Sequence, residues 1–290
     1  MASEQQCFDA FSPPISVVVP EHYNHGIIFA SPHSGRTYPP AFTQRTCLPL
    51  AALRRNEDAL IDELITPLSG AGYPTLRAHF PRCYVDVNRA PDELLPAWQM
   101  NGDDETSTPR AKAGLGVIPT AIAEHLPIYK TPLPKEVISA RIEQLYTPYH
   151  DALQTLIDAA IARAGLALVL DCHSMPATSA AGRVRPDIIL GDRFGASAHP
   201  DLVHLTEKVF KAAGYDVTRN YPYAGGYVTS HYGEPNTGCH VIQIEVNRQI
   251  YMNTAKFTPT DGFKPLQECF LKLAETLHPY MEHERPLAAE

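Results

Sequence analysis

Two histidines, each placed where a predicted strand ends, are the side chains best suited to metal chemistry. His33 follows the apolar residues 27–30 in "HGIIFASPHSG", and His173 follows the apolar stretch of "LALVLDCHSMP". Neutral imidazole is a good zinc ligand, and a catalytic zinc site takes about three protein ligands and keeps one position for water. The pair therefore predicts a shared metal site if both strands lie in one sheet. The alternative is two hydrogen-bonded loop or core histidines.

A carboxylate is the expected third ligand, and the segment "NEDALIDEL" offers three candidates, Glu57, Asp58 and Asp62. It belongs to a predicted amphipathic helix, "LPLAALRRNEDALIDELITPLSGAGY", whose leucines recur at helical spacing and whose end is marked by Gly70 and Gly72. On that helix Glu57 lies nearest the apolar face, while Asp58 and Asp62 share a neighbouring stripe at i, i+4. A solvated acidic helix face is the alternative interpretation.

Glu245 is the candidate general base. In "VIQIEVNRQIYM" it stands between Ile244 and Val246 on a predicted strand, where an unpaired buried carboxylate is costly. A carboxylate beside a metal can take a proton from an attacking water and so act as a general base. The alternative is a structural ion pair with Arg248.

Asn88 and Arg89, at the end of "CYVDVNR", form a candidate clamp for a substrate carboxylate. The alternating pattern predicts a strand that ends there, before Pro91. A planar guanidinium offers paired donors that match a carboxylate. A loop-fixing salt bridge from Arg89 to Asp92 or Glu93 is the alternative.

The glycine-rich segment "AGGYVTSHYG" predicts a flexible loop that closes on a substrate, with His231 as a polar contact. The chain has neither G-x-G-x-x-G nor G-x-x-x-x-G-K, so a nucleotide site is not expected.

The six cysteines occur singly, without a C-x-x-C pair, and are expected to be reduced thiols rather than zinc-ribbon ligands or disulfides. Cys172, next to His173, is an alternative candidate as a nucleophile. Neighbouring residues on a strand point to opposite sides, so direct pairing of Cys172 with His173 is not expected.

The elements expected to position these side chains alternate between strands and helices. Further strands are predicted at 75–78 and 215–219, in "PDIILGD" and in "CHVIQIEVNRQIYM". The segment "PKEVISARIEQLYTPYHDALQTLIDAAIARAG" predicts one long helix or a proline-interrupted pair, and helices are also expected at 200–213 and in "DGFKPLQECFLKLAETLHPYMEH". Residues 96–120 are rich in loop-forming residues and predict a long surface excursion, with an active-site flap as its candidate role.

This alternation is typical of an α/β sheet with helices on both faces. No linker marks a domain boundary, so residues 1–290 are expected to form a single domain. In such sheets ligands bind outside the carboxyl ends of the strands. The polar residues at the strand ends therefore indicate a site at that edge.

The charge balance argues against nucleic-acid and anionic-membrane partners. The net charge is -8 and no run of five or more basic residues occurs, so a small-molecule partner is expected. The N-terminal segment has no basic region followed by an apolar core, and no apolar run reaches about 20 residues. The protein is therefore expected to be soluble and cytoplasmic.

Seven stretches together resemble the N-formylglutamate amidohydrolase family: "SPHSGRTYP", "NEDALIDEL", "YVDVNRAPDEL", "DCHSMP", "ILGDRFG", "GGYVTSHYGEP" and "IEVNRQIYMN". They occur in the family's order from about residue 25 to residue 255. The family looks related in fold to zinc carboxypeptidases and aspartoacylase. The resemblance implies a mixed, mostly parallel sheet flanked by helices, that is, a zinc-carboxypeptidase-like (phosphorylase/hydrolase-like) fold, and metal-dependent hydrolysis of an N-formyl or other N-acyl acidic amino acid.

The resemblance also implies the ligands of the metal. His33 and His173 match the metal histidines of the family. The distant zinc relatives place a glutamate three residues after their first histidine, but here Arg36 stands there, so the carboxylate ligand must come from elsewhere. Asp58 is favoured, with Glu57 and Asp62 as the alternatives that remain open.

The resemblance also implies the roles of Glu245 and of the Asn88–Arg89 pair, and further contacts are expected beside them. Glu245 matches the catalytic glutamate, and Asn88 with Arg89 resembles the carboxylate-binding pair. Tyr84 or Arg82 is a further candidate for holding the substrate carboxylate. The metal, with Arg36 as a candidate helper, would polarise the acyl oxygen.

The predicted reaction is hydrolysis of the amide bond of N-formyl-L-glutamate, or of a similar N-acyl amino acid, with one divalent metal. Zn²⁺ is the default, and Mn²⁺, Fe²⁺ or Co²⁺ would be tolerated by the same ligands. Members that act in histidine degradation tend to read "PHTG" and "TDWHVDRLY" where this chain has "PHSG" and "EDALIDELI", which leaves the exact substrate open.

The alternatives are a zinc carboxypeptidase, another N-acyl amino acid deacylase, and a non-catalytic protein that binds an acidic metabolite. The oligomeric state also stays open, with a homo-oligomer as one alternative.

Overall fold

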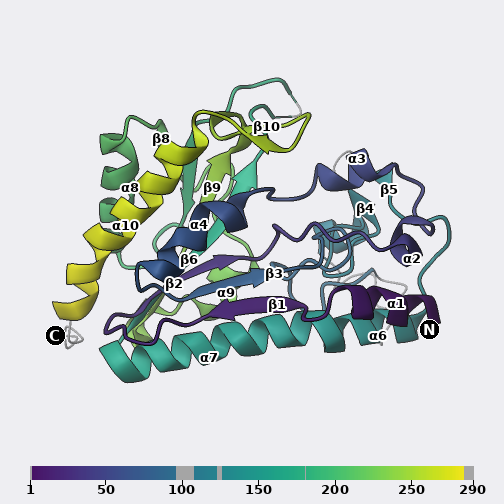
Figure 1. Ribbon diagram of the computed structural model, residues 1–290, viewed down its shortest axis with the longest axis horizontal. Coiled ribbons are helices and arrows are strands. Elements are labelled where there is room, and N and C mark those ends of the chain that lie inside the picture. The colour runs from purple at the N-terminus through teal and green to yellow at the C-terminus, as the bar shows by residue number, and fades with distance from the viewer. Residues whose placement is uncertain (1, 96–107, 123–125, 180, 284–290) are drawn as a thin grey trace. The chain divides into compact units, whose positions relative to one another are not determined.

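A seven-stranded sheet organises the chain in the computed structural model, which describes residues 2–95, 108–122, 126–179 and 181–283 (Figure 1). The strand order is β1-β3-β2-β6-β9-β7-β8. The strands are β1 (Ile15–Val18), β2 (Ile27–Ser31), β3 (Thr75–Ala78), β6 (Ala167–Met175), β7 (Ile188–Gly191), β8 (Val217–Arg219) and β9 (Cys239–Asn247). Strands β2, β6 and β9 are parallel, β7 runs antiparallel to β9, and β8 is parallel to β7. The predicted mixed, mostly parallel sheet is confirmed.

The helices are α1 (Ala2–Ala10), α2 (Pro40–Thr43), α3 (Leu50–Arg54), α4 (Ile61–Gly70), α5 (Pro109–Lys112), α6 (Lys135–Arg141), α7 (Thr147–Ala164), α8 (Pro200–Ala212), α9 (Tyr227–Tyr232) and α10 (Phe263–His283). A π-helical segment, Ile142–Tyr146, joins α6 to α7 without a break, so the long helix expected before β6 is present. Two small sheets pair β4 (Ala121–Ile122) with β5 (Leu126–Pro127) and β10 (Met252–Asn253) with β11 (Thr258–Pro259). Within the described ranges, no helix is both long enough and apolar enough to cross a membrane.

The described chain forms two compact units. The first comprises Met1–Ser16, Pro32–Glu57 and Arg77–Ala152, and it holds α1, α2, α3, α5 and α6. The second comprises Val17–Ser31, Asp58–Leu76 and Leu153–Glu290, and it holds β2, β6, β7, β8 and β9 with the helices α4, α8, α9 and α10. The expectation of one domain over residues 1–290 stays a prediction.

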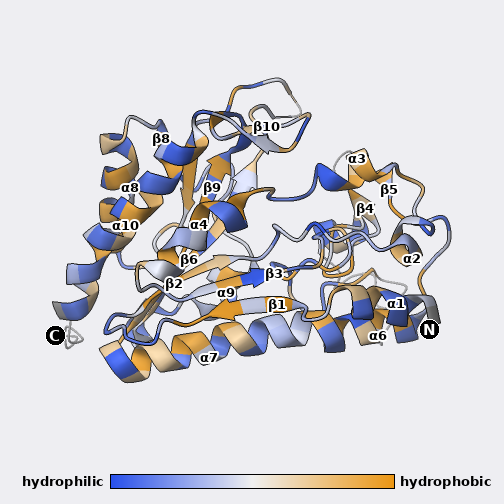
Figure 2. Cartoon of the chain, in the orientation of Figure 1, coloured by the Kyte–Doolittle hydropathy of each residue, from blue (hydrophilic) through white to orange (hydrophobic). Residues whose placement is uncertain are grey.

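One apolar core cluster of the second unit lies on one face of its strands. Side chains alternate along a strand, and every second residue of the central strands joins one apolar cluster with α4, α8 and α10: Ile27, Phe29, Leu168, Leu170, Cys172, Ile242, Ile244 and Val246. Helix α10 packs against both α4 and α8 on this face (Figure 1). Figure 2 shows orange and blue alternating along α8 and α10, as expected for helices with one buried face. Helix α9 contacts β9.

The single helix predicted over "LPLAALRRNEDALIDELITPLSGAGY" is wrong. Helix α3 ends at Arg54, α4 begins only at Ile61, and Leu60 between them has a left-handed backbone with φ of 67°. Such a conformation is costly for a branched side chain, but Leu60 is buried in the core, and the Tyr251 hydroxyl donates a 2.8 Å hydrogen bond to the carbonyl of Ala59. Tertiary contacts therefore override the helical periodicity.

The strand predicted at "CYVDVNR" is also wrong. Residues 82–90 form turns, with the Tyr84 amide bonded to the Pro81 carbonyl at 2.8 Å and the Asp86 amide bonded to the Val117 carbonyl at 2.8 Å. The apolar and polar residues are buried alike here, so their alternation does not mark a half-buried strand. Of the excursion predicted over 96–120, residues 96–107 lie outside the described residues.

Candidate active site

Four polar side chains share one face of β6 and β9. In the parallel register His173 lies opposite Glu245, and Asp171 lies opposite Gln243. Neighbouring strands are about 4.8 Å apart, so these four residues form one compact patch near the carboxyl ends of both strands. All four are at most 8% exposed. The site predicted at the carboxyl edge of the sheet therefore contains two of the predicted residues, His173 and Glu245.

Both ring nitrogens of His173 contact carboxylates. Nδ1 is 2.9 Å from Asp58 Oδ2, and Nε2 is 2.8 Å from Asp171 Oδ2. Burial alone would lower the pKa of His173, but the two carboxylates outweigh it and raise the pKa well above its ordinary value. In the metal-free protein this arrangement favours the protonated ring, in which each nitrogen faces one carboxylate.

The ring of His33 is held in place by Asp86. It follows β2 by two residues and is buried, with Nε2 2.8 Å from Asp86 Oδ1. The Arg82 Nε donates to Asp86 Oδ2 at 2.9 Å. Burial alone would raise the pKa of Asp86, but Arg82, His33 and Arg89 hold it well below its usual range. Asp86 therefore stays ionised and fixes the ring so that Nδ1 is the nitrogen that can serve as a metal ligand.

Asp58 is oriented by two further donors. The Ser174 hydroxyl donates to Asp58 Oδ1 at 2.9 Å, and the Arg248 guanidinium lies 3.3 Å from the same oxygen. Arg248 Nε also donates to the Ser174 hydroxyl at 2.9 Å. These contacts occupy Oδ1 and direct Oδ2 towards His173.

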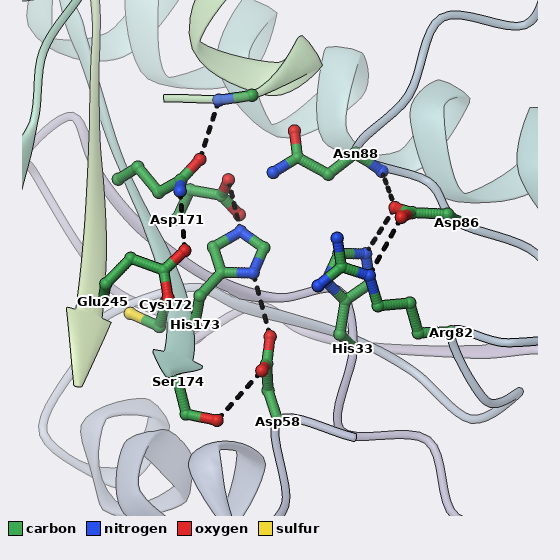
Figure 3. A network of polar contacts seen from close by, with 12 residues as sticks. His33, Asp58, Arg82, Asp86, Asn88, Asp171, Cys172, His173, Ser174 and Glu245 are labelled. Carbon is green, nitrogen blue, oxygen red and sulfur yellow. Dashed lines mark hydrogen bonds and ion pairs between the residues drawn. The ribbon is translucent and has the colours of Figure 1, made fainter. Parts of the chain in front are cut away.

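His33, Asp58 and His173 form a buried group in which one ligand atom from each lies within 4.8 Å of the others. Among the described residues it is the one group of three or more His, Cys, Asp or Glu side chains with this property. Each histidine also places its second nitrogen on a carboxylate, Asp86 or Asp171, as metal-ligating histidines almost always do (Figure 3). Two imidazoles and one carboxylate suit a divalent transition metal, so the group could hold one ion.

The other two candidate carboxylates, Glu57 and Asp62, are outside this group. Glu57 forms an ion pair with Arg54, whose Nε is 2.9 Å from Oε1. Asp62 lies in the first turn of α4, whereas Asp58 precedes that helix. The predicted stripe of Asp58 and Asp62 on one helix is therefore wrong, although Asp58 was the favoured carboxylate.

Glu245 is buried and hydrogen bonded to its own strand. Its Oε1 accepts a 2.8 Å hydrogen bond from Gln243 Nε2, and Gln243 Oε1 accepts one of 2.8 Å from the Gly226 amide. Arg248 is bonded to Asp58 and Ser174, and the alternative ion pair of Glu245 with Arg248 stays a prediction.

Asn88 and Arg89 are engaged in local contacts. The Asn88 amide donates to Asp86 Oδ1 at 3.0 Å. Arg89 Nε donates to the Leu115 carbonyl at 3.1 Å, and its Nε is 3.8 Å from Asp86 Oδ2. Asp86 is the stronger acidic neighbour of Arg89, and Glu93 of the alternative interpretation also interacts with it electrostatically. The clamp for a substrate carboxylate stays a prediction.

Three further predicted substrate contacts have different surroundings. Tyr84 is fully buried and donates its hydroxyl to Glu4, so this hydroxyl belongs to a cluster of the first unit and not to a substrate. Arg36 is exposed. His231 is exposed on α9 and stacks on Tyr227 with ring centroids 4.8 Å apart. The flexible loop expected at "AGGYVTSHYG" is in large part this helix.

Cys172 faces the apolar core, on the opposite side of β6 from His173. Burial, together with the charge of Asp171, raises the pKa of its thiol well above the ordinary value. A neutral thiol that points into the core is a poor nucleophile, so the cysteine alternative is not supported.

Asp86, Gln243 and Ser174 complete the site, and sequence reasoning did not select them. The strand predicted at "CYVDVNR" directed attention to its end and not to Asp86. A lone acid between two apolar residues is nevertheless the same signal that selected Glu245. Gln243 stands two residues before Glu245 and therefore on the same face of β9, so strand periodicity could have found it. For Ser174 no such signal exists.

Comparison with known proteins is consistent with this geometry. The model of the family described as N-formylglutamate amidohydrolase matches residues 25–252. The N-formylglutamate deformylase of Pseudomonas aeruginosa is 30% identical over 233 residues, which cover 78% of this chain and 82% of that protein. The deformylase of the same name from Pseudomonas putida is 30% identical over 214 residues, 71% of this chain and 75% of that one.

Solved structures lead to the same family. The N-formylglutamate amidohydrolase of Ralstonia eutropha JMP134 superposes with a TM-score of 0.84 at 31% identity, covering 92% of this chain and 98% of that one. The Agrobacterium tumefaciens gene product Atu2144 shares the fold, with a TM-score of 0.63 at 19% identity over 91% of this chain and 96% of that one. The family resemblance predicted from the motifs is confirmed, and the chain belongs to the N-formylglutamate amidohydrolase family of hydrolases.

Proposed function

We propose that this protein is a metal-dependent amidohydrolase that hydrolyses N-formyl-L-glutamate to formate and L-glutamate. The observation that carries the proposal is the buried group of His33, Asp58 and His173 in a chain of this family. The reaction of the relatives named N-formylglutamate deformylase supports the choice of substrate.

Three atoms of the chain would hold the ion: His33 Nδ1, Asp58 Oδ2 and His173 Nδ1. Zn²⁺ is the default for two nitrogens and one carboxylate oxygen, with a further position left for water or substrate. When bound, such an ion supplies a Lewis acid that polarises the acyl oxygen and makes a water more acidic. Asp86 and Asp171 orient the two histidines, and Ser174 with Arg248 orients Asp58.

Glu245 would act as the general base. Its carboxylate lies on the strand next to His173, in register with it, and so stands beside the proposed metal ligands. Glu245 accepts the proton of the attacking water and then donates a proton to the leaving nitrogen, which becomes the amine of glutamate. Formate leaves with the oxygen of that water.

The substrate carboxylates require cations. Arg89 is the proposed clamp, assisted by Asn88, because a guanidinium pairs with a carboxylate through two parallel hydrogen bonds. Arg36 follows His33 by three residues, is exposed, and is the proposed second cation.

Metal content and activity should be measured together on the same samples. Wild type is expected to contain about one metal ion per chain and to release formate from N-formylglutamate, and His173→Ala should lose both. Metal without formate release would redirect the search to other N-acyl amino acids. No metal in unchelated protein, combined with binding of an acidic metabolite, would sink the enzymatic proposal.

Glu245→Gln tests the base separately. The variant should retain its metal and lose about 10²- to 10⁴-fold in kcat, the usual contribution of a general base. Full activity in this variant would remove Glu245 from the mechanism while leaving the metal site untouched.

A further inference from the structure

The segment of residues 224–226 lies directly against the polar face of the sheet. A Cβ added to Gly191 would lie 2.8 Å from the carbonyl carbon of Ala224 and 2.9 Å from the nitrogen of Gly225. Gly191 is the register partner of Gln243, the residue that is bonded to Glu245. The absence of a side chain at Gly191 therefore lets residues 224–226 approach the strand pair beside the proposed base.

This segment is anchored at its far end. Gly225 has a φ of 125°, a backbone that favours glycine, and a Cβ there would lie 2.3 Å from the hydroxyl of Thr229. The same hydroxyl donates a 2.7 Å hydrogen bond to the Gly226 carbonyl. Thr229 is fully buried, so the position of Gly226 is fixed by packing as well as by this bond.

Gly226 determines which way the Gln243 amide faces. The Gly226 N–H is a donor 2.8 Å from one end of the amide, so that end must be the oxygen. The other end is then the NH₂ group, which is a donor and lies 2.8 Å from Glu245 Oε1. The hydrogen bonds from Thr229 to Gly226, from Gly226 to Gln243 and from Gln243 to Glu245 therefore form one chain that ends on the carboxylate of the proposed base.

We propose that Gln243 is a positioning residue for Glu245, and that residues 224–226 support the base rather than close over the substrate. The inference rests on the proposed function, because it assumes that Glu245 is the general base. A carboxylate at the end of a flexible side chain transfers protons efficiently only when its oxygens are held in place, and the Gln243 amide holds one of them.

Gln243→Met tests the role of the donor, because methionine has a similar volume and lacks the NH₂ group. The expected result is a fall in kcat of about 10- to 100-fold, as for other groups that orient a reacting residue, with KM and metal content within about twofold of wild type. Gln267→Met is the matched control. Gln267 donates a 3.0 Å hydrogen bond to the Glu63 carbonyl in the same unit, so its loss should leave kcat unchanged.

A structural role is separated from a positioning role by repeating Gln243→Met in the Glu245→Gln background. If Gln243 acts through Glu245, the second substitution changes kcat less than twofold there, because the base is already absent. An equal loss of kcat in both backgrounds would overturn the inference. Full activity of Glu245→Gln alone would instead overturn the proposed base, so the two failures are distinguishable.

Thr229→Val probes the same chain from its far end and covers the case in which Gln243→Met does not fold. Removal of the hydroxyl should lower kcat about 3- to 10-fold through a displaced Gly226, again only while Glu245 is present. Thr206→Val is the matched control, since the buried Thr206 hydroxyl donates a 2.8 Å bond to the Leu202 carbonyl inside α8. Equal kcat for Thr229→Val, Thr206→Val and wild type would contradict the proposed support.

Discussion

Successive side chains of strands β6 and β9 point to opposite faces of the sheet, and the two faces differ in composition. The face towards α4, α8 and α10 is apolar from Leu168 to Cys172 on β6 and from Ile242 to Val246 on β9. The other face is apolar only in its first half, at Ala167, Val169 and Val241, and then becomes polar: Asp171, His173, Gln243 and Glu245.

The comparison shows how a core can determine the geometry of a site that it does not touch. A slip of one residue in the register would move each apolar set to the opposite face, so burial of one face specifies the register of the whole strand pair. That register places His173 opposite Glu245. The polar half remains buried because its charges and amides have partners, for example the pairing of Asp171 with His173.

The largest expected effect comes from the apolar face. Leu170→Ala should lower the free energy of unfolding by about 3 to 5 kcal/mol, because Leu170 is fully buried between the strands and the helices. Urea denaturation measures this loss. The kcat of the folded fraction should stay near that of wild type. A loss below about 1 kcal/mol would mean that this face does not determine the register as argued.

A smaller effect, on metal affinity, is expected from the polar face. Asp171→Asn keeps an acceptor for His173 Nε2 but removes the negative charge, so the imidazole becomes a weaker ligand. The affinity for Zn²⁺, measured by competition with a chelator, should fall about 10- to 100-fold. The free energy of unfolding of the metal-free variant should change far less than in Leu170→Ala. Unchanged affinity would leave Asp171 with a purely structural role.

The pH dependence of stability should also separate the two faces. The pKa of His173 is raised in the folded state, so protonation stabilises the metal-free protein fully below its unfolded pKa of about 6.5. That stabilisation is lost as the pH rises through the folded pKa. The metal-free protein should therefore lose stability on going upward from about pH 6.5, and His173→Asn should lack this decline. Chemical denaturation from pH 6.5 to 9 checks the difference; parallel curves for the two proteins would contradict it.

Most of the sheet could be predicted because its strands are short apolar runs that end on polar residues. Strands β2, β6, β7 and β9 and the helices α8 and α10 occur where hydrophobic periodicity places them. His173 and Glu245 were accessible for the same reason, since each is a charged or titratable side chain on a strand that is otherwise buried.

The errors lie where tertiary contacts decide the local structure. The break before α4 depends on the left-handed Leu60 and on the bond from Tyr251, which is almost 200 positions away in the sequence. Asp86 is buried between two turns and pairs with His33, and no local pattern encodes that contact. The carboxylate that orients a metal ligand is therefore harder to predict from sequence than the ligand itself.

The smallest effect is expected at Cys172, which lies on the apolar face although the next residue, His173, lies on the polar face. Cys172→Ala should leave kcat within about twofold of wild type and lower the free energy of unfolding by about 1 kcal/mol, because the thiol behaves as a small buried apolar group. The raised pKa of Cys172 also predicts that a thiol reagent does not modify this residue until the protein unfolds. Formate release by Cys172→Ala, measured beside that of His173→Ala, shows which of the two faces carries the catalytic side chains. Loss of activity in the cysteine variant with an unchanged free energy of unfolding would restore the nucleophile and place chemistry on the side of the sheet that we assign to packing alone.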